Sequence, residues 1–177
     1  MQKYSETIGL PVICTKDGKK LGIIKDVIFC PRAREVKAFL LEKKGGRIRD
    51  KIIMLEDVVH LGRDAAVVDD ISCMVDLKTA EKEGSIKGRM ELKGLKIYSR
   101  AGSDIGVVTD VLFDFNTGFI EGIEVSDGLL QDVIQGRNIL PLIGKVEFSS
   151  ENVLVDREAV EEMTSTGGGL KKKILGE

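Results

Sequence analysis

Short apolar runs alternate with turn-forming residues along most of the chain. In the first half, runs dense in β-branched residues predict strands over residues 10–15, 21–29, 36–42, 52–55 and 65–68. Long helical periods are absent from this stretch. Many short strands within about 65 residues predict a small β-barrel.

Several of the predicted strands are apolar at nearly every position, where a half-exposed strand would alternate. A small barrel explains this pattern if both its interior and an outer packing surface bury aliphatic side chains. Turn signals separate the strands: Asp17-Gly18 and Ala101-Gly102 suit a first hairpin turn, and residues 116–118 (NTG) suit the next turn of the second half.

The whole pattern occurs twice. Residues 18–29 (GKKLGIIKDVIF) align without a gap on residues 102–113 (GSDIGVVTDVLF) at an offset of 84, and five of these twelve positions are identical. The copies run from about residue 5 to 70 and from about residue 90 to 156. We therefore expect an all-β chain of two tandem small antiparallel barrels, each followed by a short helix.

The segments outside the barrels set the expected domain limits. Residues 76–83 read as a helix that ends at Gly84, and residues 156–163 read as a helix with Asp156 as its N-cap. The predicted domains are residues 1–84, a first barrel with helix and linker, and residues 85–164, a second barrel with helix. Residues 165–177 are predicted to be a flexible Gly- and Lys-rich tail.

Two positions of the repeat stand out chemically. Gly22 and Gly106 lie within strands, where glycine points to a bend, a bulge or a close backbone approach. Asp26 and Asp110 are carboxylates in apolar surroundings. They could be catalytic or bind a metal, but each copy has one and neither has a nearby base, so we predict that they accept hydrogen bonds from backbone donors at a strand bend.

These residues carry a resemblance to a known family. Residues 21–27 (LGIIKDV), 105–111 (IGVVTDV) and the closing strands expected around residues 54–58 and 152–156 resemble the PRC-barrel domain. That domain is named for the photosynthetic reaction-centre H subunit and also forms the C-terminal half of a ribosome-maturation factor. The resemblance implies an interaction module without shared catalytic residues.

Charge is unevenly distributed. The net charge is −2, which argues against a surface that grips nucleic acid everywhere, and we expect no DNA binding. Residues 32–51 nevertheless carry an excess of five positive charges. The candidate partner-binding residues in this basic strip are Arg32, Arg34, Lys43, Lys44, Arg47, Arg49 and Lys51. The alternative is that they protect a strand edge from aggregation.

Catalytic, metal and cofactor sites are not predicted. His60 is the only histidine, and the three cysteines lack a CxxC pair and leave an odd number. The one glycine triplet, at residues 167–169, lacks the strand and helix of a phosphate-binding loop. No apolar run reaches the length of a membrane span, so we expect a cytoplasmic protein with no membrane insertion.

The resulting functional hypothesis is a non-catalytic adaptor or scaffold that binds an unknown protein partner or associates with itself. Opposite net charges, +2 for residues 1–84 and −4 for residues 85–177, favour association between the halves or between copies. The alternative is an RNA- or ribosome-associated factor that uses the basic strip. The sequence has no Trp and only 5% aromatic residues, which favours a protein partner over stacked bases.

Overall fold

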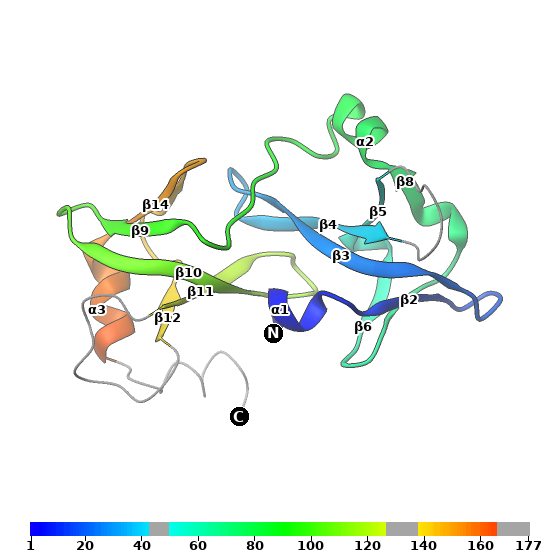
Figure 1. Ribbon diagram of the computed structural model, residues 1–177, viewed down its shortest axis with the longest axis horizontal. Helices are drawn as coiled ribbons and strands as arrows, with labels where there is room; N and C mark the ends of the chain where they lie inside the picture. Colours follow the sequence, from blue (N-terminus) through cyan, green and yellow to red (C-terminus); the bar gives the residue numbers. More distant parts are fainter. Residues whose placement is uncertain (43–49, 127–137, 166–177) are drawn as a thin grey trace. The chain divides into compact units, whose positions relative to one another are not determined.

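The computed structural model of the chain describes residues 1–42, 50–126 and 138–165 (Figure 1). Its Cα atoms group into two compact units. The first unit holds Gln2–Met90 together with the turn Phe115–Gly118, and the second holds Glu91–Asp114 and the described residues from 119 onward. The boundary expected after residue 84 stays a prediction, and residues 166–177 of the expected tail lie outside the described residues.

The first unit contains the strands predicted for the first copy. The sheet order is β6-β7-β2-β3-β4-β5-β8. Its strands are β2 (Pro11–Cys14), β3 (Lys20–Cys30), β4 (Glu35–Glu42), β5 (Lys51–Met54), β6 (Val58–Leu61), β7 (Ala66–Val68) and β8 (Met74–Asp76). Neighbours pair antiparallel as expected, except that β2 and β7 pair parallel. Before this sheet come β1 (Gln2–Lys3) and α1 (Tyr4–Thr7).

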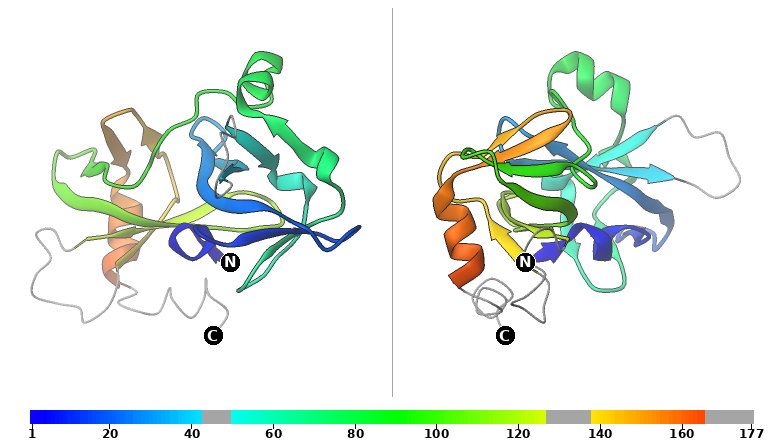
Figure 2. Two further views of the ribbon diagram at one scale, coloured as in Figure 1. Left: turned by 45° about the vertical axis from the view of Figure 1, so that its right-hand side comes forward. Right: turned by 60° about the vertical axis from the view of Figure 1, so that its left-hand side comes forward.

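The second unit has a similar arrangement of strands. Its sheet order is β12-β11-β10-β9-β14-β13, and again one pair, β9 with β14, is parallel. The strands are β9 (Lys96–Ser99), β10 (Asp104–Phe113), β11 (Ile120–Val125), β12 (Asn138–Pro141), β13 (Glu147–Phe148) and β14 (Asn152–Val155). In both units the strands curl into an open, barrel-like sheet (Figure 2). The prediction of two tandem small barrels is confirmed.

Both faces of the central strands of the first unit are buried, as the apolar runs predicted. One cluster joins sheet residues to the segment that follows the sheet, and it consists of Ile28, Ala38, Leu40, Ile52, Leu77, Ala80 and Ile86. Val27, Phe39 and Ile53 alternate with these strand residues and are buried too. Because successive side chains of a strand point to opposite faces, β3, β4 and β5 need apolar residues almost throughout.

α2 ends, and α3 begins, where the sequence indicates. α2 (Leu77–Glu83) is closed by Gly84, which has a φ of 80° and whose N–H donates to the carbonyls of Ala80 and Glu81. α3 (Arg157–Ser165) follows Asp156 directly. Both carboxylate oxygens of Asp156 accept hydrogen bonds from outside this helix, one from the Arg100 side chain and one from the Lys145 N–H. Asp156 therefore ties the start of α3 to the barrel.

The repeated Gly and Asp positions mark irregularities in the strands. The pairing of β2 with β3 shifts register next to Gly22, and a Cβ on Gly22 would lie 2.8 Å from the carbonyl oxygen of Glu42. Gly106 has a φ of 137° beside the equivalent register shift of β9 and β10. A bulge and a close backbone approach were both predicted as reasons for these glycines. A register shift occurs at both positions, and the close approach occurs at Gly22.

The aspartates stabilise a second shift in each copy. The register slips between Ile24 and Asp26, and again between Val108 and Asp110. Each aspartate accepts a hydrogen bond from the next backbone N–H, at 2.8 Å in the first copy and 2.9 Å in the second. These two contacts are of the kind that was predicted, a backbone donor bound by a carboxylate at an irregularity of the strand.

One expected strand is wrong. The stretch around residues 54–58 was expected to be a closing strand, but residues Leu55–Asp57 form the 3-10 helix η1 between β5 and β6. The N–H of Val58 donates to the carbonyl of Leu55, which tightens the chain into a turn. Glu56 and Asp57 are consequently exposed at the surface of the first unit.

Candidate interaction groove

The predicted partner-binding residues fall into two groups along β4. Arg32 and Arg34 lie in the turn before β4, and Arg34 adopts a left-handed φ of 53°. Lys51 begins β5, after the far end of β4. Eight residues of strand separate the two groups, about 25 Å at the usual rise per residue. Lys43, Lys44, Arg47 and Arg49 lie outside the described residues.

Ion pairs neutralise part of the basic strip. The Lys51 ammonium pairs with the Asp76 carboxylate at 3.2 Å, and Lys37 pairs with Glu35. Both pairs are partly exposed, so their contribution to stability is small, about 0–1 kcal/mol each. Their main effect is to reduce the positive charge that the described part of the strip presents.

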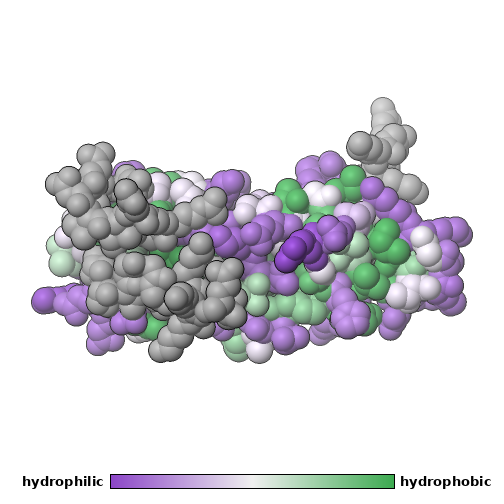
Figure 3. Space-filling model, turned by 90° about the horizontal axis from the view of Figure 1, so that it is seen from below, coloured by the Kyte–Doolittle hydropathy of each residue, from purple (hydrophilic) through white to green (hydrophobic). Residues whose placement is uncertain are grey.

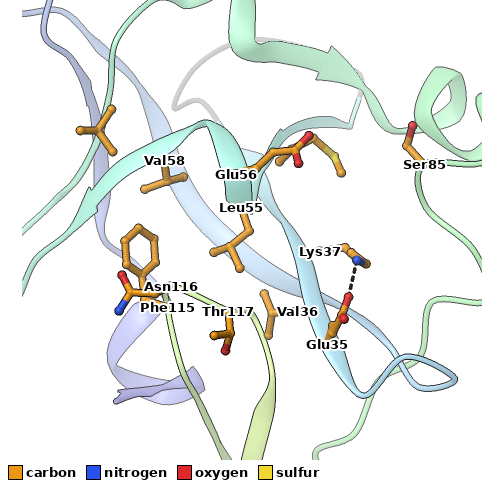
Figure 4. Close-up of a pocket in the computed structure, with 12 residues that line it drawn as sticks. Glu35, Val36, Lys37, Leu55, Glu56, Val58, Ser85, Phe115, Asn116 and Thr117 are labelled. Atoms are coloured by element: carbon orange, nitrogen blue, oxygen red, sulfur yellow. Dashed lines mark ion pairs between the residues drawn. The ribbon is translucent and has the colours of Figure 1, made fainter.

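A hollow of the first unit lies beside the start of β4. It has a volume of about 700 Å³, and we call it the Val36 groove (Figure 4). Its lining residues are Glu35, Val36, Lys37, Met54, Leu55, Glu56, Val58, Val59, Ser85, Phe115, Asn116 and Thr117. Aliphatic side chains from β4, β5, η1 and β6 share the lining with charged, hydroxyl and amide groups.

Residues from four separate segments of the chain meet in this groove. Figure 4 shows Val36 and Leu55 between the Glu35–Lys37 pair on one side and Phe115 and Asn116 on the other. The turn Phe115–Gly118 is fixed by its backbone, because the Val36 N–H donates a 2.8 Å hydrogen bond to the carbonyl oxygen of Gly118. A Cβ on Gly118 would lie 2.9 Å from the Val36 carbonyl oxygen, so only glycine permits this approach.

A second, smaller hollow shares Glu56 and Val59 with the Val36 groove. We call it the acidic hollow; its volume is about 410 Å³. Its lining residues are Glu56, Asp57, Val59, Asp69, Asp70, Ser72, Cys73 and Val75. Four of these eight residues are carboxylates, so this hollow presents negative charge where the Val36 groove has a mixed apolar and polar lining.

The pKa values of three groups in this hollow are shifted by their surroundings. Asp57 is exposed, but partial desolvation of its carboxyl, and secondly the neighbouring Glu56, raise its pKa. The Lys16 ammonium lies 2.7 Å from Asp70 and, with the Ser72 N–H, lowers the pKa of Asp70 to about 2. Burial and the nearby carboxylates raise the pKa of Cys73 to about 11, which keeps it a neutral thiol at physiological pH.

Large exposed apolar side chains are few in the described ranges. They are Met1, Val59, Ile71, Phe119 and Ile143. Figure 3 shows hydrophilic and hydrophobic residues interspersed over one face of the molecule. Val59 alone among these five lines the Val36 groove, with 41% of its surface exposed.

Sequence reasoning missed the groove because its residues come from distant segments. Val59 lies in β6, a strand that was not among those predicted, and Phe115 lies some 80 positions from Val36 along the chain. The only available signal was the apolar pair Val58-Val59 directly after two acidic residues. That pattern does not reveal which surface the pair faces.

Two general properties of the described residues bear on function. Residues 1–42, 50–126 and 138–165 contain no group of three or more His, Cys, Asp or Glu side chains arranged to hold a metal ion. Within the same ranges, no helix combines the length and apolar character required to cross a membrane.

Comparison with known proteins agrees with the repeat and with the two barrels. The PRC-barrel domain matches residues 1–72 and again residues 87–161. None of the curated proteins compared with the chain matches it significantly. The two matched segments contain all the strands of the two sheets except β8, and together they cover most of the sequence. The chain therefore belongs to the PRC-barrel domain family, with two tandem copies of the domain.

Proposed function

We propose that this chain is a non-catalytic interaction module that binds a protein partner through the Val36 groove. Family membership supports the general class, because PRC-barrel domains act as interaction modules. The observation that carries the proposal is the groove itself. Val36, Leu55, Val58 and Val59 supply apolar side chains to its lining, and Lys37 and other polar groups supply the rest.

The composition of the groove suits a protein segment. Protein interfaces commonly combine an apolar centre with a polar rim, and a few anchor side chains carry most of the binding energy. A hollow of about 700 Å³ has room for several apolar side chains of a partner. Arg32 and Arg34 precede the groove strand β4, so we expect acidic residues in the partner next to its apolar anchors.

The first experiment is to purify the intact chain from its native cells at low salt. Mass spectrometry identifies co-purifying proteins, and the ratio of absorbance at 260 and 280 nm detects nucleic acid. A protein in stoichiometric amount supports the proposal. A second copy of the chain is one candidate for that partner, and size-exclusion chromatography with light scattering detects it.

RNA binding is the second candidate function, because residues 32–51 carry an excess of five positive charges. The ion pairs of Lys37 and Lys51 weaken this case for the described part of the strip. RNA binding through Lys43, Lys44 and Arg47 should fall steeply with salt and be lost when these three become Glu. Absence of RNA binding at low salt excludes this candidate.

A further inference from the structure

Each copy of the repeat has a turn at the same place, between β3 and β4 in the first copy and between β10 and β11 in the second. At the repeat offset of 84, residues 115–118 (FNTG) correspond to residues 31–34 (PRAR). The last residues of the two turns, Arg34 and Gly118, are both left-handed, with φ of 53° and 77°. Because Arg34 adopts this conformation, a left-handed φ alone does not explain the glycine at position 118.

Gly118 also permits a close approach within the first unit. Its carbonyl oxygen accepts the 2.8 Å hydrogen bond from the Val36 N–H. A Cβ at this position would lie 2.9 Å from the Val36 carbonyl oxygen and 3.0 Å from a methyl group of Leu55. The glycine therefore holds the turn Phe115–Gly118 in place beside β4 and η1, where its side chains join the Val36 groove.

The turn brings an aromatic side chain into the groove. Phe115 is the one aromatic residue among the described residues that line it, and the first copy has Pro31 at the equivalent position. The Phe115 side chain is half-buried, and Figure 4 shows its ring turned toward Val58. Aromatic rings contribute large contact areas to protein interfaces, so Phe115 is the strongest candidate for an anchoring contact in this groove.

A polar side chain lies next to this ring. Asn116 is exposed and lines the groove, and its carboxamide makes no hydrogen bond within residues 1–42, 50–126 and 138–165. A carboxamide offers two donors and an acceptor, the groups that pair with the C=O and N–H of an extended peptide. The ring of Phe115 beside the amide of Asn116 therefore suits a peptide that presents a large apolar side chain and backbone groups available for hydrogen bonding.

We infer that the turn Phe115–Gly118 determines the specificity of the Val36 groove by binding an extended segment of the partner protein. A large apolar side chain of that segment packs on Phe115, and its backbone pairs with the Asn116 carboxamide. Gly118 positions these two residues without touching the partner. This inference rests on the proposed function and names the kind of segment that the groove binds. Because residues 115–118 belong to the second copy of the repeat, partner binding requires residues from both copies.

The probe for this inference is a set of random peptides selected by phage display on the intact chain and counter-selected on its Val59→Glu variant, so that they bind at the groove. Their affinity is measured for intact chains that carry Phe115→Ala, Asn116→Ala or Phe119→Ala. Phe119 is the matched control, because it directly follows the turn and does not line the groove. We expect Phe115→Ala to weaken binding at least about tenfold and Asn116→Ala about threefold, with Phe119→Ala unchanged.

Urea unfolding of each variant separates a contact with the peptide from a structural role. Since Asn116 is exposed, Asn116→Ala should keep the wild-type free energy of unfolding while it weakens peptide binding, and this result decides the question even where Phe115→Ala does not fold. Wild-type affinity of the groove peptides for either folded variant overturns the inference, as does an equal loss in Phe119→Ala, and both leave the groove as the binding surface. A selection that yields no peptide sensitive to Val59→Glu contradicts the proposed function, and this inference with it.

Discussion

The backbone N–H of Val36 donates a 2.8 Å hydrogen bond to the carbonyl oxygen of Gly118, and this bond joins β4 to the turn Phe115–Gly118. Gly118 has a φ of 77° and sits so close to Val36 and Leu55 that a side chain has no room. One backbone contact therefore shapes one wall of the Val36 groove. It depends on glycine for both conformation and space.

Replacing Gly118 with Ala should strongly destabilise the first unit. A left-handed φ costs a non-glycine residue about 1–2 kcal/mol, and overlap with the Val36 carbonyl raises the expected total to about 2–4 kcal/mol. Urea unfolding measures this change. Gly102→Ala is the matched control, because Gly102 has a φ of 87° with nothing within 4 Å of a built Cβ. Equal losses of unfolding free energy in the two variants would show that the close approach at Gly118 does not contribute to the effect.

The Tyr4 hydroxyl donates a 2.9 Å hydrogen bond to the carboxylate of Asp26, which also accepts from the Val27 N–H. Tyr4→Phe should cost about 1–2 kcal/mol of unfolding free energy, because a hydrogen bond to a charged group is lost. Asp26→Asn should cost at least as much. A double-mutant cycle should give a coupling of about 1 kcal/mol between them, and a coupling near zero would contradict the bond.

Asp70 should titrate well below an ordinary aspartate. Its pKa is lowered from 3.8 to about 2 by Lys16 and Ser72. Since the folded state holds the lower pKa, this contribution to stability is present above pH 3.8 and is lost as the pH falls through 2. NMR titration of the Asp70 carboxyl carbon checks the midpoint. Lys16→Met should move the midpoint upward, and an unchanged midpoint would refute the ion pair.

The pKa of Asp57 should be shifted in the opposite direction, above that of an ordinary aspartate. Burial and Glu56 raise its pKa above 3.8. Glu56→Gln removes the repulsion but not the burial, so the pKa should fall part of the way toward the ordinary value. The same carboxyl NMR experiment measures this shift. If Glu56→Gln leaves the titration of Asp57 unaltered, repulsion between these two carboxylates does not contribute to the raised pKa.

Local signals were sufficient to predict most strands of the repeat. Residues 21–29 and their counterparts are rich in β-branched and other apolar residues, and β3 (Lys20–Cys30) contains that whole run. Gly84 was recognised as a helix end because a left-handed C-cap strongly favours glycine, and its φ of 80° agrees. These features depend on a few consecutive residues, so the sequence alone reveals them.

Features that depend on tertiary contact escaped prediction. Residues 54–58 (MLEDV) were expected to form a closing strand, yet the chain turns there through η1, and this stretch contains no glycine or proline that would indicate a turn. β8 (Met74–Asp76) forms only by pairing with β5, where Val75 faces Ile52. The Val36 groove likewise needs residues from four separate segments, which only the folded chain brings together.

The central claim is that the Val36 groove is the partner-binding surface. The most direct test measures the affinity of the co-purifying protein for the wild-type chain, Val59→Glu and Ile143→Glu. Val59 and Ile143 are 41% and 42% exposed, so the two substitutions disturb the surface equally, but only Val59 lines the groove. We predict that Val59→Glu weakens binding at least about tenfold, or 1.4 kcal/mol, while Ile143→Glu binds like the wild type. Equal affinity of all three proteins would contradict the claim.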